Sequence, residues 1–255
     1  MIDYRPLDEA ISAEGLRIVL VRGFPSPWGQ AAKAIFDLKG LKYLAAPQLL
    51  GEENSALVAW SGQRSAPVVA WNDEKPIHDW IEILYLAERL APTPALIPAD
   101  PLQRALMFGL SRELLGRLGL VWNRRLLMFV PAMDSGSPPP AMARMAQSYG
   151  YDKRDAELAN TRIAAILNML ATQLKAQYAR GSLYFVGDAL SALDIYWVTV
   201  MNTVSPLPRE QCPIPEEMRP AFVATEPEVL AALAPILLEH RDRIFAEAFR
   251  NPMEL

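Results

Sequence analysis

The placement of the prolines sets the strongest limit on how this chain can fold. The segment APTPALIPADP, residues 91–101, holds four prolines in eleven positions. Proline lacks a backbone N–H and clashes inside a helix, and it is excluded from central strands, so this segment can form neither element. We therefore expect a linker at residues 92–101 between two domains. A length of 255 residues agrees with one or two domains of ordinary size.

The segment before the linker begins with a strand, a helix and a second strand. Residues 16–22, LRIVLVR, are mostly apolar and β-branched, which is typical of a strand buried on both faces. Ser26 followed by Pro27 is typical of a helix start, with Ser as the N-cap, and Gly40 can end that helix. Residues 41–47, LKYLAAP, then predict a second strand. So short a helix between two strands implies a right-handed parallel βαβ unit.

The rest of this half completes a known order of elements. Residues 65–71, SAPVVAW, predict a strand, residues 75–79 a short fourth strand, and residues 80–90 an apolar-faced helix. A βαβ unit followed by ββα is the order of the thioredoxin fold. Residues 16–91 are therefore predicted to form an α/β, thioredoxin-like N-terminal domain. Residues 1–15 form an N-terminal extension that this fold does not require.

Beyond the linker the strand patterns disappear. Apolar residues recur at helical spacing over about 102–130, 153–180, 191–204 and 226–249. The proline-rich stretches 135–142 and 204–217 are expected to be surface loops. Residues 102–255 are therefore predicted to form an all-α helical-bundle domain.

Composition excludes several classes of function. A hydrophobic share of 51% can fill a real core, while a net charge of −4 without a basic block makes nucleic acid a poor partner. No apolar run reaches 18 residues and the first residues do not form a signal peptide, so we expect a cytoplasmic protein without membrane contact. Cys212 is the only cysteine, and His78 and His240 are far apart in sequence. We therefore expect no disulfide and no bound metal.

Three motifs, in this order and spacing, resemble the soluble glutathione transferases. Residues 26–29, SPWG, resemble the Ser-Pro-aromatic-Gly segment of the serine-type enzymes, and residues 66–69, APVV, resemble the cis-proline segment. Residues 187–194, GDALSALD, resemble the capping box of the helical domain, in which Ser191 and Asp194 exchange hydrogen bonds at a helix start. The likeness covers roughly residues 16–250 and implies a thioredoxin-like domain followed by a helical one.

The resemblance implies a site for glutathione. Ser26 stands where the family has its catalytic serine, whose hydroxyl, together with a helix N-terminus, favours the thiolate; the alternative is that Ser26 is only an N-cap. Ala66 and Pro67 would be joined by a cis bond, so that the backbone of Ala66 pairs with the cysteinyl residue of glutathione. Arg64 either meets the glycyl carboxylate or is a solvated loop residue.

The resemblance weakens at Asp79 and Trp80, where the family usually has Glu-Ser. Asp79 can hold the γ-glutamyl ammonium, but the indole of Trp80 cannot replace the serine hydroxyl that holds the carboxylate. Alternatively, Asp79 is a plain N-cap and Trp80 a core residue. Five large apolar side chains either line a pocket for the second substrate or are plain core residues. They are Phe24, Trp28 and Trp122, and with them Met107 and Phe108.

The sequence therefore predicts a glutathione transferase that uses glutathione as co-substrate against a small apolar electrophile, as a homodimer. Conjugation, thiolytic ether cleavage, isomerisation and peroxide reduction all use the same thiolate, and nothing in the sequence separates them. The alternative from another class is a non-catalytic module that binds apolar ligands or a protein, and Trp80 in the serine position favours it.

Overall fold

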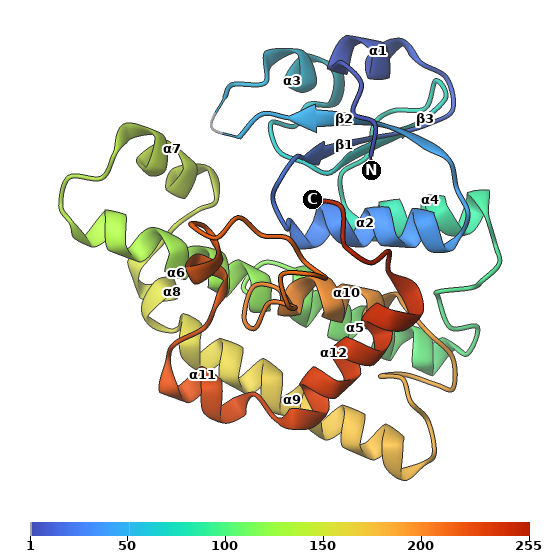
Figure 1. Cartoon of the computed structure of the whole chain (residues 1–255), viewed down its shortest axis with the longest axis vertical. Helices are drawn as coiled ribbons and strands as arrows, with labels where there is room; N and C mark the ends of the chain where they lie inside the picture. The colour runs from blue at the N-terminus through green and yellow to red at the C-terminus, as the bar shows by residue number, and fades with distance from the viewer. Residues whose placement is uncertain (1, 51) are drawn as a thin grey trace. The chain divides into compact units, whose positions relative to one another are not determined.

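The computed structural model describes residues 2–50 and 52–255, which divide into two compact units (Figure 1). The first unit comprises Met1–Ile97, Leu207–Pro215 and Phe245–Leu255, and the second comprises Pro98–Pro206 and Glu216–Ile244. The sequence pattern predicts that all of residues 102–255 belong to the second domain. Two stretches from that range instead pack with the first unit.

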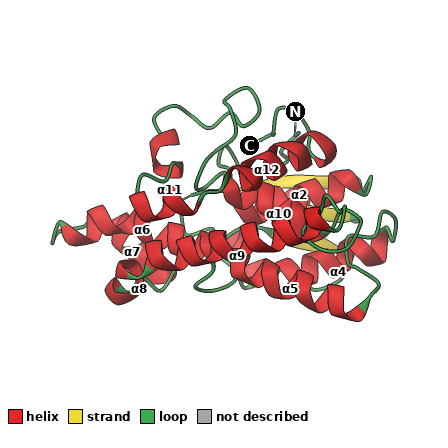
Figure 2. Ribbon diagram, turned by 90° about the horizontal axis from the view of Figure 1, so that it is seen from below, coloured by secondary structure: helices red, strands yellow, loops and turns green. Residues whose placement is uncertain are grey.

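The first unit contains a mixed sheet (yellow in Figure 2), to which the described residues contribute three strands in the order β2-β1-β3. β1 (Leu16–Val21) pairs parallel with β2 (Tyr43–Gln48) and antiparallel with β3 (Val68–Trp71). Every residue of β1 is buried, as predicted for a strand covered on both faces. The fourth strand expected at residues 75–79 is not formed, because only Ile77 pairs with Val69, as an isolated bridge.

Helices cover both faces of this sheet. α2 (Pro27–Leu38) and α4 (Trp80–Leu90) contact each other on one face and have the bounds that the sequence predicts. α1 (Leu7–Ser12) and α3 (Ser55–Ser61) lie on the opposite face and were not predicted. They enclose a buried cluster formed by Ala10, Val19, Ala46, Leu57 and Val68. The N-terminal extension therefore supplies part of the core.

The segments near both ends of the described chain attach to the first unit. Tyr4 forms a parallel bridge with Ala45 beside β2, so the extension covers the outer edge of that strand. At the other end, the carbonyl oxygen of Glu254 accepts hydrogen bonds from the side chains of Gln30, at 3.1 Å, and Lys33 on α2. The C-terminal segment therefore lies along α2.

The second unit consists of helices and loops in the part of the chain that the structure describes (red and green in Figure 2). Its helices are α5 (Pro101–Leu115), α6 (Leu120–Asp134), α7 (Pro140–Ser148), α8 (Lys153–Glu157), α9 (Ala159–Ala179), α10 (Ala192–Met201), the 3-10 helix η1 (Arg219–Phe222), α11 (Pro227–Ala232) and α12 (Pro235–Ala248), whose end belongs to the first unit. The helical patterns expected over 102–130 and 153–180 are each divided in two. Between α5 and α6 the chain turns at Leu118, which has a positive φ of 62°.

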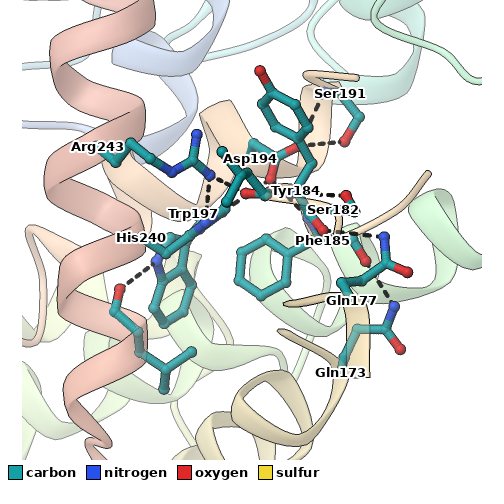
Figure 3. Close-up of polar contacts among 12 residues, drawn as sticks. Gln173, Gln177, Ser182, Tyr184, Phe185, Ser191, Asp194, Trp197, His240 and Arg243 are labelled. Carbon is teal, nitrogen blue, oxygen red and sulfur yellow. Dashed lines mark hydrogen bonds and ion pairs between the residues drawn. The ribbon is translucent and has the colours of Figure 1, made fainter. Parts of the chain in front are cut away.

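A buried carboxylate holds the second unit together (Figure 3). The predicted capping box at the start of α10 is present, and both the N–H and the hydroxyl of Ser191 donate to Asp194 Oδ2, at 2.9 and 2.8 Å. The other oxygen, Oδ1, accepts from the N–H of Phe185 at 3.0 Å and from His240 Nε2 on α12 at 2.9 Å. Because Arg243 donates to His240 Nδ1 at 3.0 Å, the proton of the neutral ring lies on Nε2. The cap therefore also joins α10 to α12.

No helix among residues 2–50 and 52–255 combines the length and the apolar character needed to cross a bilayer.

Candidate functional site

The pairing of the strands brings three of the predicted site segments to the same end of the sheet. Val68 lies opposite Val19, so continuing the antiparallel register places Ala66 and Pro67 beside the end of β1, from which the chain runs on toward Ser26. Ile77 forms an antiparallel bridge with Val69, and extending the register of that bridge by two residues places Asp79 opposite Pro67. The start of α2, the proline loop and the start of α4 therefore meet where β1 ends.

Ser26 occupies the N-cap position of α2 but does not cap the helix with its side chain. Its carbonyl oxygen accepts from the N–H of Gln30, and its own N–H donates to the carbonyl oxygen of Phe24, each at 2.8 Å. No described residue exchanges a hydrogen bond with the Ser26 hydroxyl, although the residue is buried. The hydroxyl is therefore available to a ligand at the positive end of the helix.

The sequence around Ser26 explains why the chain turns there. Gly23 has a φ of +74°, a left-handed conformation that glycine adopts without strain, so the chain can leave β1 sharply. Pro27 at the first helical position fixes the start of α2. A methyl group on Gly29 would lie 3.1 Å from Leu20 Cδ2, so glycine lets α2 approach β1 closely. These constraints hold Ser26 at the junction of strand and helix.

The proline loop has the geometry that the sequence predicts. The Ala66–Pro67 peptide bond is cis. Arg64, two residues earlier, is exposed to solvent. Gln63 Nε2 lies 3.0 Å from His78 Nε2, and this contact ties the loop to the chain directly before α4. The sequence does not predict this link, since side-chain contacts between loops leave no periodic signal.

The start of α4 is capped by Asp79. Its Oδ1 accepts from the N–H of Ile81 at 2.8 Å, which is an N-cap bond. The second carboxylate oxygen takes part in no hydrogen bond that the structure records with the described residues. Trp80 is half-buried at the first position of the helix. Asp79 can therefore cap the helix with one oxygen and bind a cation with the other.

The aromatic residues predicted for the second substrate belong to different units. Phe24 and Trp28 are half-buried and flank Ser26 in the first unit. Trp122 belongs to the second unit, where its ring contacts Tyr149 edge to face at 6.5 Å. The Arg125 guanidinium lies 5.8 Å from the centroid of the Trp122 ring. Met107 of the same unit is fully buried, and Phe108 is half-buried.

A buried lysine lies on the same helix as Ser26. Lys33 is only 5% exposed, and burial lowers the pKa of its ammonium group to about 8, although the nearby carboxyl groups of Glu254 and Asp37 act to raise it. Burial also raises the pKa of Asp37, against the opposing effect of Arg250. Lys33 lies seven residues after Ser26, two turns along α2. The sequence does not indicate this buried group, because a lysine within a helical pattern is usually solvated.

The described residues contain no group of three or more His, Cys, Asp or Glu side chains that could hold a metal ion. Cys212 is a free and buried thiol in the first unit.

Comparison with known proteins identifies the fold. No family model and no curated protein matches the sequence. Among solved structures, a glutathione S-transferase from Methylobacterium radiotolerans in complex with glutathione sulfonate is similar, with 16% identity, a TM-score of 0.59 and coverage of 91% of this chain and 90% of that one. A glutathione S-transferase from Xanthobacter autotrophicus has 17% identity, a TM-score of 0.60 and coverage of 94% and 98%. Maleylpyruvate isomerase from Pseudomonas aeruginosa has 19% identity, a TM-score of 0.54 and coverage of 90% and 91%. The chain has the fold of the glutathione transferases.

Proposed function

We propose that this protein binds glutathione and activates its thiol as a thiolate for reaction with an apolar electrophile. The observation that carries the proposal is the hydroxyl of Ser26, which stands at the N-terminus of α2 and is not used as a cap. If the Ser26 hydroxyl acted only as an N-cap, it would accept a hydrogen bond from a backbone N–H in the first turn of α2. The fold, which this chain shares with glutathione transferases, supports the same assignment.

Ser26 stabilises the anion and does not act as its base. The Ser26 hydroxyl donates a hydrogen bond to the thiolate sulfur, and the N-terminus of α2 favours negative charge at the same place. A hydrogen bond to a charged group contributes roughly 1.5 to 3 kcal/mol and the helix terminus up to about 1. Together these can lower the pKa of a thiol by about two units, which corresponds to about 2.7 kcal/mol. Most of the bound thiol is then ionised at neutral pH.

The remaining residues bind the ends of the tripeptide and the electrophile. The backbone of Ala66, held by Pro67, pairs with the cysteinyl residue, and Arg64 meets the glycyl carboxylate. Asp79 binds the γ-glutamyl ammonium with the oxygen that does not cap α4. In this assignment the first unit binds glutathione, and the second unit holds the electrophile. Phe24 and Trp28, which flank Ser26, offer apolar side chains to that second substrate.

Two observations favour other outcomes. Trp80 stands where the family has a serine that binds the γ-glutamyl carboxylate, and an indole supplies only one N–H. A non-catalytic module that binds apolar ligands is therefore the second candidate. Among reactions, isomerisation is a specific alternative to conjugation, since two of the similar structures are named maleylpyruvate isomerases. Lyase and peroxidase chemistry would use the same thiolate.

Retention on immobilised glutathione and elution with free glutathione divide these candidates. Calorimetric titration of glutathione into the parent and an Asp79→Asn variant sharpens the test, because Asn also caps a helix but cannot balance the ammonium charge. We expect roughly tenfold weaker binding at an unchanged thermal midpoint, since a charge-assisted hydrogen bond is lost. Asp100→Asn, at the capped start of α5, is the matched control and should bind as the parent does. A parent that neither binds nor is retained would leave the non-catalytic module.

We also propose that the protein is a cytoplasmic homodimer, as the family resemblance implies. Light scattering at tens of micromolar protein should give twice the mass of the 28.4 kDa chain. A mass equal to one chain would contradict the dimer and leave the assignment of Ser26 untouched.

A further inference from the structure

A cavity of about 470 Å³ lies within the second unit, and this volume is in the range of small-molecule sites. Three segments form its walls: the first two turns of α5, the C-terminal half of α9, and the loop between α9 and α10. None of the residues assigned above to glutathione or to the electrophile lines it. The cavity is therefore separate from the proposed site of the thiol chemistry.

Hydrogen bonds hold the loop of this cavity against α9 (Figure 3). Gln173 Nε2 donates to the carbonyl oxygen of Phe185 at 2.6 Å, and Gln177 Nε2 donates to that of Gly187 at 2.9 Å. The N–H of Phe185 donates to Asp194 at 3.0 Å, which joins the loop to α10 as well. The loop is therefore fixed by contacts within the protein.

Three carboxamide groups belong to residues that line the cavity. Because the nitrogen atoms of Gln173 and Gln177 donate to the loop, their Oε1 atoms are left as acceptors, and neither accepts a hydrogen bond from a described residue. Gln103 of α5 supplies the third group. Its Oε1 would lie 2.6 Å from a methyl group on Gly187, so glycine lets this side chain pass close to the loop. The lining is therefore rich in neutral oxygen acceptors.

Two opposite charges line the same cavity without pairing. Arg180 directly follows the last residue of α9, and Asp188 belongs to the loop. Both residues are exposed, and no salt bridge joins them to each other or to another described residue. A carboxylate beside Arg180 and an ammonium group beside Asp188 would each gain a charge-assisted hydrogen bond that these side chains do not make within the described chain.

The rest of the lining is apolar. It comes from Leu106 on α5, Ala176 on α9 and Val186 in the loop. Val186 is buried, whereas Leu106 keeps 42% of its surface exposed although it is a large apolar residue. An apolar group bound in the cavity would cover part of that surface and would gain stability by leaving water.

We infer that this cavity binds a free α-amino acid with an apolar side chain. Arg180 binds the α-carboxylate with two parallel hydrogen bonds, and Asp188 and the carboxamide oxygens accept hydrogen bonds from the α-ammonium group. The apolar side chain of the ligand packs on Leu106 and Val186. A ligand with a single charge would leave either Arg180 or Asp188 without a partner. The inference rests on neither glutathione nor Ser26.

Leucine and two analogues that each lack one charged group test the requirement for both charges. 4-Methylpentanoate has the same apolar body and the carboxylate but no ammonium group, and 3-methylbutylamine has the ammonium group but no carboxylate. In calorimetric titrations into the full chain, leucine should bind at least about tenfold more tightly than either analogue.

Two variants assign each charge to its residue. Arg180→Gln should weaken the binding of leucine and 4-methylpentanoate but not that of 3-methylbutylamine. Asp188→Asn should weaken the binding of leucine and 3-methylbutylamine but not that of 4-methylpentanoate. Arg154→Gln, an exposed change on α8 in the same unit, is the matched control and should leave leucine binding unchanged.

Two further variants place the site and complete the test. Ala176→Trp, which fills the cavity from the exposed side of α9, should weaken leucine binding at least about tenfold. Asp79→Asn should leave it unchanged, and a loss of leucine binding in that variant would place the amino acid in the proposed glutathione site and overturn the inference. Equal leucine affinities for the parent and Arg180→Gln, or no leucine binding by the parent at millimolar concentration, would also overturn it. If Arg180→Gln does not fold, an undiminished leucine affinity of Ala176→Trp would do so. Failure to bind glutathione would affect only the proposed enzyme.

Discussion

Helix starts in this protein use side chains of the same kind in different ways. Asp79 and Asp100 accept hydrogen bonds from the N–H groups of α4 and α5, and Asp194 closes a capping box at α10. Ser26 has the sequence of an equally good cap but makes no such bond. A side chain that stays out of the local hydrogen bonding at a helix N-terminus is available for binding an anion. Asn54 at the start of α3 also makes no cap bond, but its side chain bonds to Leu49 and Glu52 instead, whereas the Ser26 hydroxyl bonds to no described residue.

Asp194 should be far more important for stability than an exposed cap. Its carboxylate is fully buried and serves Ser191, Phe185 and His240, so Asp194→Ala leaves several buried donors without a partner. We expect a loss of about 3 to 5 kcal/mol in the free energy of unfolding. Asp100→Ala removes two bonds at a solvent-exposed cap and should cost about 1 kcal/mol. Urea unfolding of both variants measures the difference, and equal losses would show that the buried network adds nothing to the cap.

Lys33 should make stability depend on pH in an unusual direction. The pKa of its ammonium group is about 8 in the folded protein, against 10.5 for an unperturbed lysine, so between these values the unfolded chain binds more protons. The free energy of unfolding then rises with pH across this window, by up to about 3 kcal/mol in total. Lys33→Met removes this pH dependence. Denaturant unfolding from pH 8 to 10.5 should show the parent gaining stability relative to the variant.

The exposed Lys175 on α9 provides the control for this measurement. Lys175→Met should keep the slope of the parent. Parallel curves for the parent and Lys33→Met would mean that the ammonium group of Lys33 is not desolvated.

At the level of elements, the N-terminal helix α1 acts as part of the domain and not as an appendage. Ala10 is fully buried against Val19 and Ala46, on the face of the sheet that α1 shares with α3. Ala10→Asp would bury a charge without a partner, and we expect the thermal midpoint to fall by well over 10 °C, since a cost of several kcal/mol applies. Ser12→Asp, on the exposed side of the same helix, should shift it by only a few degrees. Similar midpoints for the two variants would mean that α1 does not pack on the sheet.

Sequence predicts those elements whose ends are marked by local chemistry. α2 was predicted to its bounds because Ser26-Pro27 begins it and Gly40 follows its end, and α4 because a polar turn precedes an apolar face. α1 and α3 were missed, since helices of six and seven residues are marginal alone and form here by packing against the sheet. The break between α5 and α6 was missed because the apolar spacing continues through Leu118.

At the level of the whole molecule, the chain crosses between units more often than its sequence suggests. Residues 207–215 and 245–255 return to the first unit, where they bring Glu254 to α2. No local pattern predicts such returns, because they depend on contacts between segments about 220 residues apart. The positions of Ser26, Ala66, Pro67 and Asp79 were predictable from motifs. Their hydrogen bonds were not, since motifs do not determine rotamers.

The central claim is that Ser26 stabilises the thiolate of bound glutathione, and the absorbance of that thiolate against pH tests it most directly. Ser26→Ala should raise the pKa of the bound thiol by one to two units, which corresponds to about 1.4 to 2.7 kcal/mol. Because the Ser26 side chain makes no cap bond, the thermal midpoint should change little. Superimposable titration curves for the parent and variant complexes would contradict the account, and would show that Ser26 has no part in activating the thiol.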